Sequence, residues 1–137
     1  MKKTAVLYET MTGHSKKIAT ALSEALKAPL LRAGQKLPEA VEVLVIVSGI
    51  YGGKSKESLL DYVANLDPGS CCNVIFVTSS AGVKKTPLVL REAVSRLGFE
   101  VLGDHSLPGS FLFLRLFHPS QSDITQLIKE IKQEVDA

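Results

Sequence analysis

Residues 41–49 read Val-Glu-Val-Leu-Val-Ile-Val-Ser-Gly and carry the strongest structural signal in the chain. Apart from Glu42, every residue from 41 to 47 is valine, leucine or isoleucine. A strand that is buried on both faces has this composition, and such strands occur in parallel sheets covered by helices on each side. The run therefore predicts a central strand of a parallel sheet.

β-rich runs and helical patterns alternate on both sides of this strand. The other strands are expected at 4–8, 29–32, 74–77 and 99–102, with the weakest signal at 29–32. Helices are expected around apolar stripes at helical spacing, which contain Ile18 and Leu22, Leu59 and Val63, Leu90 and Val94, and Ile128 and Ile131. This alternation predicts a doubly wound, five-stranded parallel α/β sheet, formed by a single domain over residues 1–137.

The charge and composition of the chain exclude several classes of function. The 16 basic and 14 acidic residues give a net charge of +2, and the basic residues are spread along the chain, which argues against nucleic-acid binding. No apolar run reaches the roughly 18 residues of a membrane-spanning helix, and the first residues do not resemble a signal peptide. The two cysteines, Cys71 and Cys72, are adjacent and favour buried thiols, so a cytoplasmic location is expected.

The loop after the first strand is a candidate phosphate site. In doubly wound sheets, ligands bind beyond the carboxyl ends of the strands where the strand order reverses. The first loop reads Glu9-Thr10-Met11-Thr12-Gly13-His14-Ser15 and leads into a helix. Its hydroxyl groups, its glycine and the free N–H groups of the helix start suit a phosphate, although an ordinary helix cap has similar residues.

Two further loops fall at the same edge of the predicted sheet. The loop after the central strand reads Ser48-Gly49-Ile50-Tyr51-Gly52-Gly53, where the glycines permit close approach of a flat ligand and Tyr51 can stack on a ring. The next loop reads Ser79-Ser80-Ala81-Gly82-Val83-Lys84-Lys85-Thr86 and can hydrogen-bond a ligand edge through its backbone, with the two lysines expected on a solvated face. A tight strand-to-helix turn is the alternative interpretation of the glycine-rich loop.

The remaining chemistry-bearing residues give weaker signals. The three histidines, His14, His105 and His118, are too scattered to predict a metal site. His105, near the end of the last predicted strand, is expected to face either the ligand or the solvent. The apolar run at 111–117 favours core packing, with an exposed patch for a partner or a second subunit as the alternative.

In their order and spacing, the three loops resemble those of flavodoxins and the wider flavodoxin-like FMN proteins. The resemblance covers essentially the whole chain and rests on Thr10-x-Thr12-Gly13-x-Ser15, on residues 48–53 and on residues 79–82. It implies the strand order 2-1-3-4-5 and noncovalent binding of FMN. The residues that it assigns to FMN binding are Thr10, Met11, Thr12, Gly13, His14, Ser15, Ser48, Gly49, Ile50, Tyr51, Gly52, Ser79, Ser80, Ala81 and Gly82.

The resemblance implies an electron-transfer protein that acts on a redox partner protein. His14 stands where flavodoxins usually have asparagine and is more similar to flavodoxin-like quinone reductases, so an FMN-dependent oxidoreductase of small quinone- or porphyrin-like substrates is the alternative. A binding module of the same fold that has lost FMN is a second alternative. No catalytic residue and no metal are assigned, and a homodimer stays open.

Overall fold

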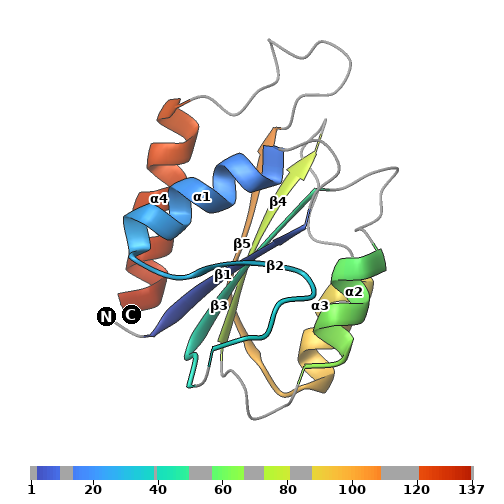
Figure 1. Cartoon of the computed structure of the whole chain (residues 1–137). Coiled ribbons are helices and arrows are strands. Elements are labelled where there is room, and N and C mark those ends of the chain that lie inside the picture. The colour runs from blue at the N-terminus through green and yellow to red at the C-terminus, as the bar shows by residue number, and fades with distance from the viewer. Residues whose placement is uncertain are drawn as a thin grey trace.

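Strands and helices alternate along the chain as predicted, except that β2 is followed directly by β3 with no helix among the described residues between them (Figure 1). The computed structural model describes residues 3–9, 14–38, 40–49, 57–66, 73–80, 88–108 and 121–136. The elements are β1 (Thr4–Glu9), α1 (His14–Leu26), β2 (Leu30–Arg32), β3 (Val43–Gly49), α2 (Glu57–Ala64), β4 (Asn73–Ser80), α3 (Leu88–Arg96), β5 (Glu100–Pro108) and α4 (Gln121–Asp136). The two cysteines at 71–72, the lysines at 84–85, the apolar run at 111–117 and His118 lie outside the described residues.

The strands form one parallel sheet in the order β2-β1-β3-β4-β5, which confirms the predicted fold class and strand order. β3 occupies the centre and pairs along its length with β1 on one side and β4 on the other. The direction of winding reverses between β1 and β3, so the switch point of the fold lies at the carboxyl ends of these two strands.

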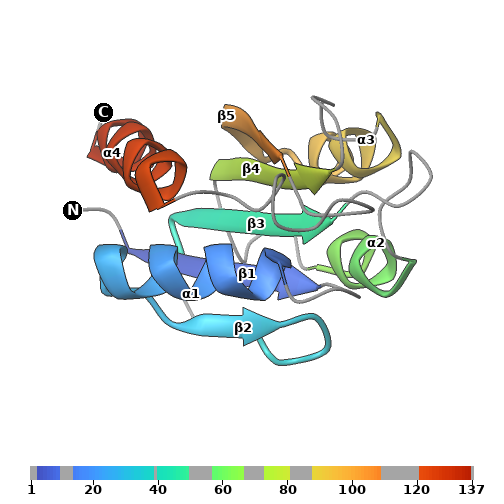
Figure 2. The ribbon, with the colours of Figure 1, turned by 90° about the horizontal axis from the view of Figure 1, so that it is seen from above.

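Helices cover both faces of the sheet (Figure 2), with α1 and α4 on one face and α2 and α3 on the other. The side chains of β3 alternate between two separate cores. Val43, Val45 and Val47 pack on the α1 and α4 side, and Leu44 and Ile46 pack on the α2 and α3 side. All five are fully buried, which explains why this strand carries no polar residue between 43 and 47.

Three strands extend further at their carboxyl ends than their apolar runs predict. β3 continues to Gly49, β4 to Ser80 and β5 to Pro108. Backbone hydrogen bonds hold these extensions. Such bonds form whether the side chains are polar or apolar, so the apolar pattern does not predict them. In β5, pairing with β4 skips Leu102, because Val74 pairs with Val101 and the next residue pairs with Gly103. This bulge lets the strand continue past the expected end at 102.

α3 ends in a glycine cap at Gly98. Gly98 adopts a φ of 82°, a conformation that glycine reaches without a steric cost. Its N–H donates to the carbonyl of Ser95 at 3.0 Å, and the N–H of Phe99 donates to the carbonyl of Val94 at 3.2 Å. This pair of bonds is the Schellman arrangement, which turns the chain directly into β5.

The described helices include none with the length and apolar character that a bilayer crossing requires.

Candidate functional site

The carboxyl ends of β1, β3 and β4 lie side by side at one edge of the sheet, called here the carboxyl edge. The strand register pairs Glu9 with Ser48 and Gly49 with Ser79. α1 begins at the same edge with His14. The fold therefore brings together the points where the three predicted loops leave or rejoin regular structure.

Some of the predicted FMN contacts are part of this described edge. His14 and Ser15 open α1, Ser48 and Gly49 close β3, and Ser79 and Ser80 close β4. The others, at 10–13, 50–52 and 81–82, lie outside the described residues. Their assignment to FMN binding stays a prediction.

A row of buried polar side chains runs beneath the carboxyl edge, one on each of three neighbouring strands. This polar row consists of Glu9, Ser48 and Thr78, which are 4%, 1% and 0% exposed. Each row member lies two positions beyond a core residue of the α2 and α3 side, namely Leu7, Ile46 and Phe76. The strands therefore change from apolar to polar on this face as they approach the edge.

Ser48 is the member of the polar row with an unmet hydrogen bond. Its Oγ is buried and has no hydrogen-bond partner within the described part of the chain. Burying a hydroxyl without a partner costs about 1–3 kcal/mol. A hydroxyl both donates and accepts, so Ser48 is suited to bond a polar group that arrives at the carboxyl edge.

Arg32 joins the carboxyl edge from β2, although no sequence pattern predicts it there. Its Nε lies 3.6 Å from Oε1 of Glu9, and the two side chains are 61% and 5% exposed. β2 pairs in parallel with β1, which sets Arg32 opposite Tyr8. The short strand that carries the weakest sequence signal thus supplies a cation to the end of β1.

The backbone of Arg32 is hydrogen-bonded within the turn at residues 32–35, and this turn is itself hydrogen-bonded to α2. The Arg32 N–H donates to Oε1 of Gln35 at 2.7 Å, and the Gln35 N–H donates to the Arg32 carbonyl at 3.0 Å. The Tyr62 hydroxyl on α2 donates to the Gln35 carbonyl at 2.6 Å. Burial raises the pKa of Tyr62 above its usual value, so the hydroxyl keeps the proton that it donates to a higher pH than an exposed tyrosine does.

An open depression of about 620 Å³ lies beside this turn. It is lined by the turn and by α2, through Ala33, Gly34, Gln35, Lys36, Leu37, Asp61, Tyr62, Asn65 and Leu66. None of these residues is among the predicted FMN contacts.

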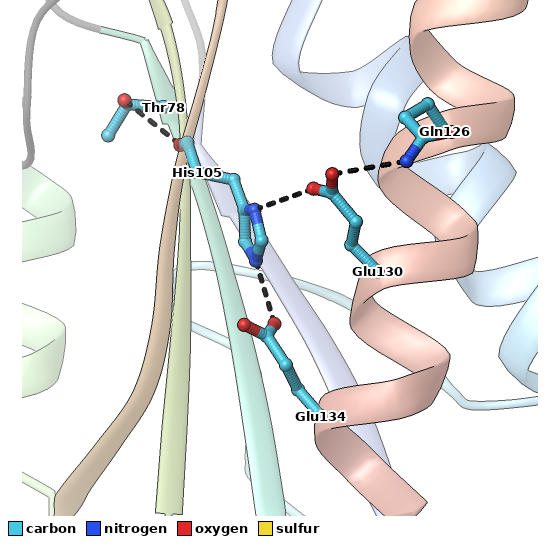
Figure 3. Close-up of polar contacts among 5 residues, drawn as sticks. All are labelled: Thr78, His105, Gln126, Glu130 and Glu134. Atoms are coloured by element: carbon cyan, nitrogen blue, oxygen red, sulfur yellow. Dashed lines mark hydrogen bonds and ion pairs between the residues drawn. The ribbon is translucent and has the colours of Figure 1, made fainter.

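His105 faces α4, so the expectation that it faces the ligand or the solvent is wrong (Figure 3). Its Nε2 lies 2.7 Å from Oε1 of Glu134, and its Nδ1 lies 3.3 Å from Oε2 of Glu130. The imidazole is 16% exposed, because β5 continues past the predicted end and lies under α4. A Cβ at position 103 would collide with the Glu134 carboxylate, so Gly103 leaves room for this contact.

Comparisons with known proteins identify the architecture. No family model and no curated protein sequence matches the chain. Solved structures do match it, including a short-chain flavodoxin associated with a non-canonical PDU bacterial microcompartment, at a TM-score of 0.70 and 18% identity over 99% of this chain and 98% of that one. A flavodoxin from the domain Archaea matches at a TM-score of 0.70 and 17% identity over the full length of both chains. The chain has the flavodoxin-like fold.

A similar flavodoxin-like structure is a WrbA-like protein from Agrobacterium tumefaciens, with a TM-score of 0.67 and 14% identity over 99% of this chain and 96% of that one. At such identities the likeness establishes the flavodoxin-like fold and leaves the chemistry to the residues of this chain. Among the described residues, no cluster of three or more histidine, cysteine, aspartate or glutamate side chains is arranged to hold a metal ion.

Proposed function

We propose that this chain binds FMN noncovalently at the carboxyl edge and transfers one or two electrons to a redox partner protein. The observation that carries the proposal is the meeting of three loop ends above the buried polar row, at the switch point of a flavodoxin-like fold. FMN supplies the electron-transfer chemistry when bound, and the protein supplies binding, orientation and electrostatics.

The start of α1 supports phosphate binding in the proposed site. The first turn of this helix contains no acidic residue, and its exposed Lys16 and Lys17 add positive charge. The positive end of the helix dipole and the free N–H groups favour an anion at this position. We assign the phosphate to Thr10, Thr12 and Ser15 and to the backbone around Gly13.

The ends of β3 and β4 support binding of the flavin ring. The unmet Ser48 hydroxyl fits a cofactor whose ring edge carries both hydrogen-bond donors and acceptors. Tyr51, two residues past the end of β3, is assigned to stacking on the ring. Ser79, Ser80, Ala81 and Gly82 are assigned to its opposite edge.

The proposal is tested by titrating the apoprotein with FMN and following flavin fluorescence. We expect saturable binding in the parent and a loss of about 1.5–3 kcal/mol in Thr12→Ala, because that variant lacks one hydroxyl donor to a charged group. Thr20→Ala is the matched control, since this threonine lies in α1 and its hydroxyl donates to the Lys16 carbonyl. No FMN binding by the parent would favour a binding module, and equal affinity in Thr12→Ala would refute the phosphate assignment.

A second measurement separates a carrier from an oxidoreductase. The FMN-loaded protein is mixed with NADH or NADPH and a soluble quinone, and turnover is followed by nicotinamide absorbance. We expect turnover to be slow without a reductase partner, as a carrier requires. Fast steady-state turnover would instead establish the FMN-dependent oxidoreductase.

A further inference from the structure

We infer that Arg32 selects the phosphorylated flavin, FMN, over riboflavin. This inference rests on the proposed function and assigns to β2 a role in the specificity of the same site. Riboflavin has the same ring and ribityl chain as FMN and lacks only the phosphate. A residue that recognises the phosphate therefore changes the affinity for FMN and leaves that for riboflavin unchanged.

The first step of the inference is that Arg32 is fixed in place. Gln35 bonds both the N–H and the carbonyl of Arg32, and the Tyr62 hydroxyl holds Gln35 in turn. Oε1 of Glu9 lies 3.6 Å from Nε, at ion-pair distance. An arginine whose backbone is held in this way presents its guanidinium from a defined position on β2.

The second step is that the guanidinium keeps hydrogen-bonding capacity. Arginine carries five N–H donors, and the Glu9 contact engages the Nε side of the group. The side chain is 61% exposed, so the terminal NH₂ groups are accessible to a ligand at the carboxyl edge. Two parallel N–H donors match the geometry of two phosphate oxygens.

The third step is the position of this cation. Glu9 is the last residue of β1, and the proposed phosphate loop begins at the next residue of the chain. The start of α1 and the end of β2 lie at the same edge of the sheet, as Figure 2 shows. Arg32 therefore stands beside the strand from which the loop leaves.

The fourth step is the local balance of charge. Lys16, Lys17 and Arg32 are the described cations of α1's first turn and β2's end, and Glu9 is the anion that faces Arg32. Replacing Arg32 by a neutral residue would remove this cation from the end of β1. The loss would act on a dianionic ligand through the missing attraction.

The test measures the dissociation constants of FMN and riboflavin for the parent, Arg32→Gln and Arg32→Lys. Arg96→Gln is the matched control, because Arg96 is an exposed arginine at the last turn of α3, on the opposite edge of the sheet. We expect Arg32→Gln to weaken FMN binding about tenfold, because it loses a charge-assisted hydrogen bond that is exposed to solvent. Riboflavin binding should stay within about twofold of the parent's. Arg32→Lys should retain part of the preference, and Arg96→Gln should retain all of it.

Salt provides a readout independent of the folded yield of each variant. We expect the FMN affinity of the parent to fall with ionic strength more steeply than that of Arg32→Gln. Equal losses for FMN and riboflavin in Arg32→Gln, or no loss for either, would overturn the inference while the proposed function stands. A parent that binds neither flavin would overturn both.

Discussion

Ser48 differs from the other two members of the polar row, Glu9 and Thr78, because only the side chains of those two have a partner among the described residues. Because it has no partner among the described residues, Ser48→Ala should raise the free energy of unfolding of the apoprotein by about 1 kcal/mol. Thr78→Val is the matched control, since the Thr78 hydroxyl donates to the His105 carbonyl at 3.3 Å and its loss should lower stability by about 1 kcal/mol. Urea unfolding measures both, and a destabilised Ser48→Ala would show that the hydroxyl is bonded in solution.

Tyr62 should make the free energy of unfolding decrease at alkaline pH. Its pKa is raised by burial, so above the usual tyrosine pKa of about 10 the unfolded chain ionises first and the folded chain keeps the proton. Stability from this group is therefore complete below about pH 10 and is lost as the pH rises through the folded pKa.

Tyr62→Phe should change stability in two ways that urea unfolding at several pH values separates. The variant loses the bond to the Gln35 carbonyl, which should cost about 1 kcal/mol at neutral pH. It should also show a shallower loss of stability above about pH 10 than the parent. Identical slopes in the two proteins would mean that Tyr62 does not titrate as its burial indicates.

At the scale of elements, α4 is attached to β5 by polar contacts that depend on Gly103. In Gly103→Ala the Glu134 carboxylate must swing away from the new methyl group and give up its 2.7 Å contact with His105. We expect a loss of about 1 kcal/mol, because the obstructing atoms are the end of a flexible side chain.

A double-mutant cycle isolates this coupling. In the Glu134→Ala background, Gly103→Ala should cost measurably less, with an interaction energy of about 0.5–1 kcal/mol. Gly34→Ala is the contrasting control, since Gly34 has a φ of 107° and nothing within 4 Å of its missing Cβ, so its cost is independent of Glu134. Additive effects of the two substitutions would show that the carboxylate does not lie over Gly103.

Apolar periodicity predicts the parts of each helix and strand that form the core. It does not predict the ends of the strands where the residues are polar. The run at 43–47 gives β3 because burial on both faces requires apolar residues at every position. The same criterion ends the expected β4 at 77 and the expected β5 at 102. The Ser and Thr residues at 78–80 of β4 and the Gly-Asp-His residues at 103–105 of β5 interrupt the apolar runs.

The candidate site is predictable only where its residues are local in sequence. The loops after β1, β3 and β4 follow from the order of the elements, so His14, Ser48 and Ser79 fall at the expected edge. Arg32 is separated from Glu9 by more than twenty positions in the sequence, and the pairing of β2 with β1 brings them together. A contact made by strand pairing leaves no periodic signal in either segment.

For the whole molecule, net charge bears on the reduction potential of the FMN that we propose the chain binds. Nearby acidic residues disfavour the anionic, fully reduced flavin, whereas this chain has a net charge of +2 and carries Lys84 and Lys85 in the predicted third loop, outside the described residues. We expect the couple that forms the fully reduced flavin to be less negative than in acidic flavodoxins.

Spectroelectrochemical titration of the FMN-loaded protein measures this couple. Lys84→Glu/Lys85→Glu should move it to a more negative value, by an amount that salt reduces. Lys129→Glu/Lys132→Glu, on α4, makes the same change of net charge away from the third loop and should move it less. A couple as negative as that of an acidic flavodoxin, and insensitive to both charge reversals, would contradict the expectation.

The two edge strands of the described sheet differ in length, so they differ in how many backbone groups they offer to an added strand. β2 has three residues and ends in a charged arginine, so it offers an incoming chain few backbone groups to pair with. β5 has nine residues, and its outer backbone groups form the longer row, interrupted by the bulge and closed by Pro108. Among the described strands, β5 therefore offers a second chain more backbone groups for strand addition than β2 does, and proline or lysine substitutions along β5 should oppose such pairing.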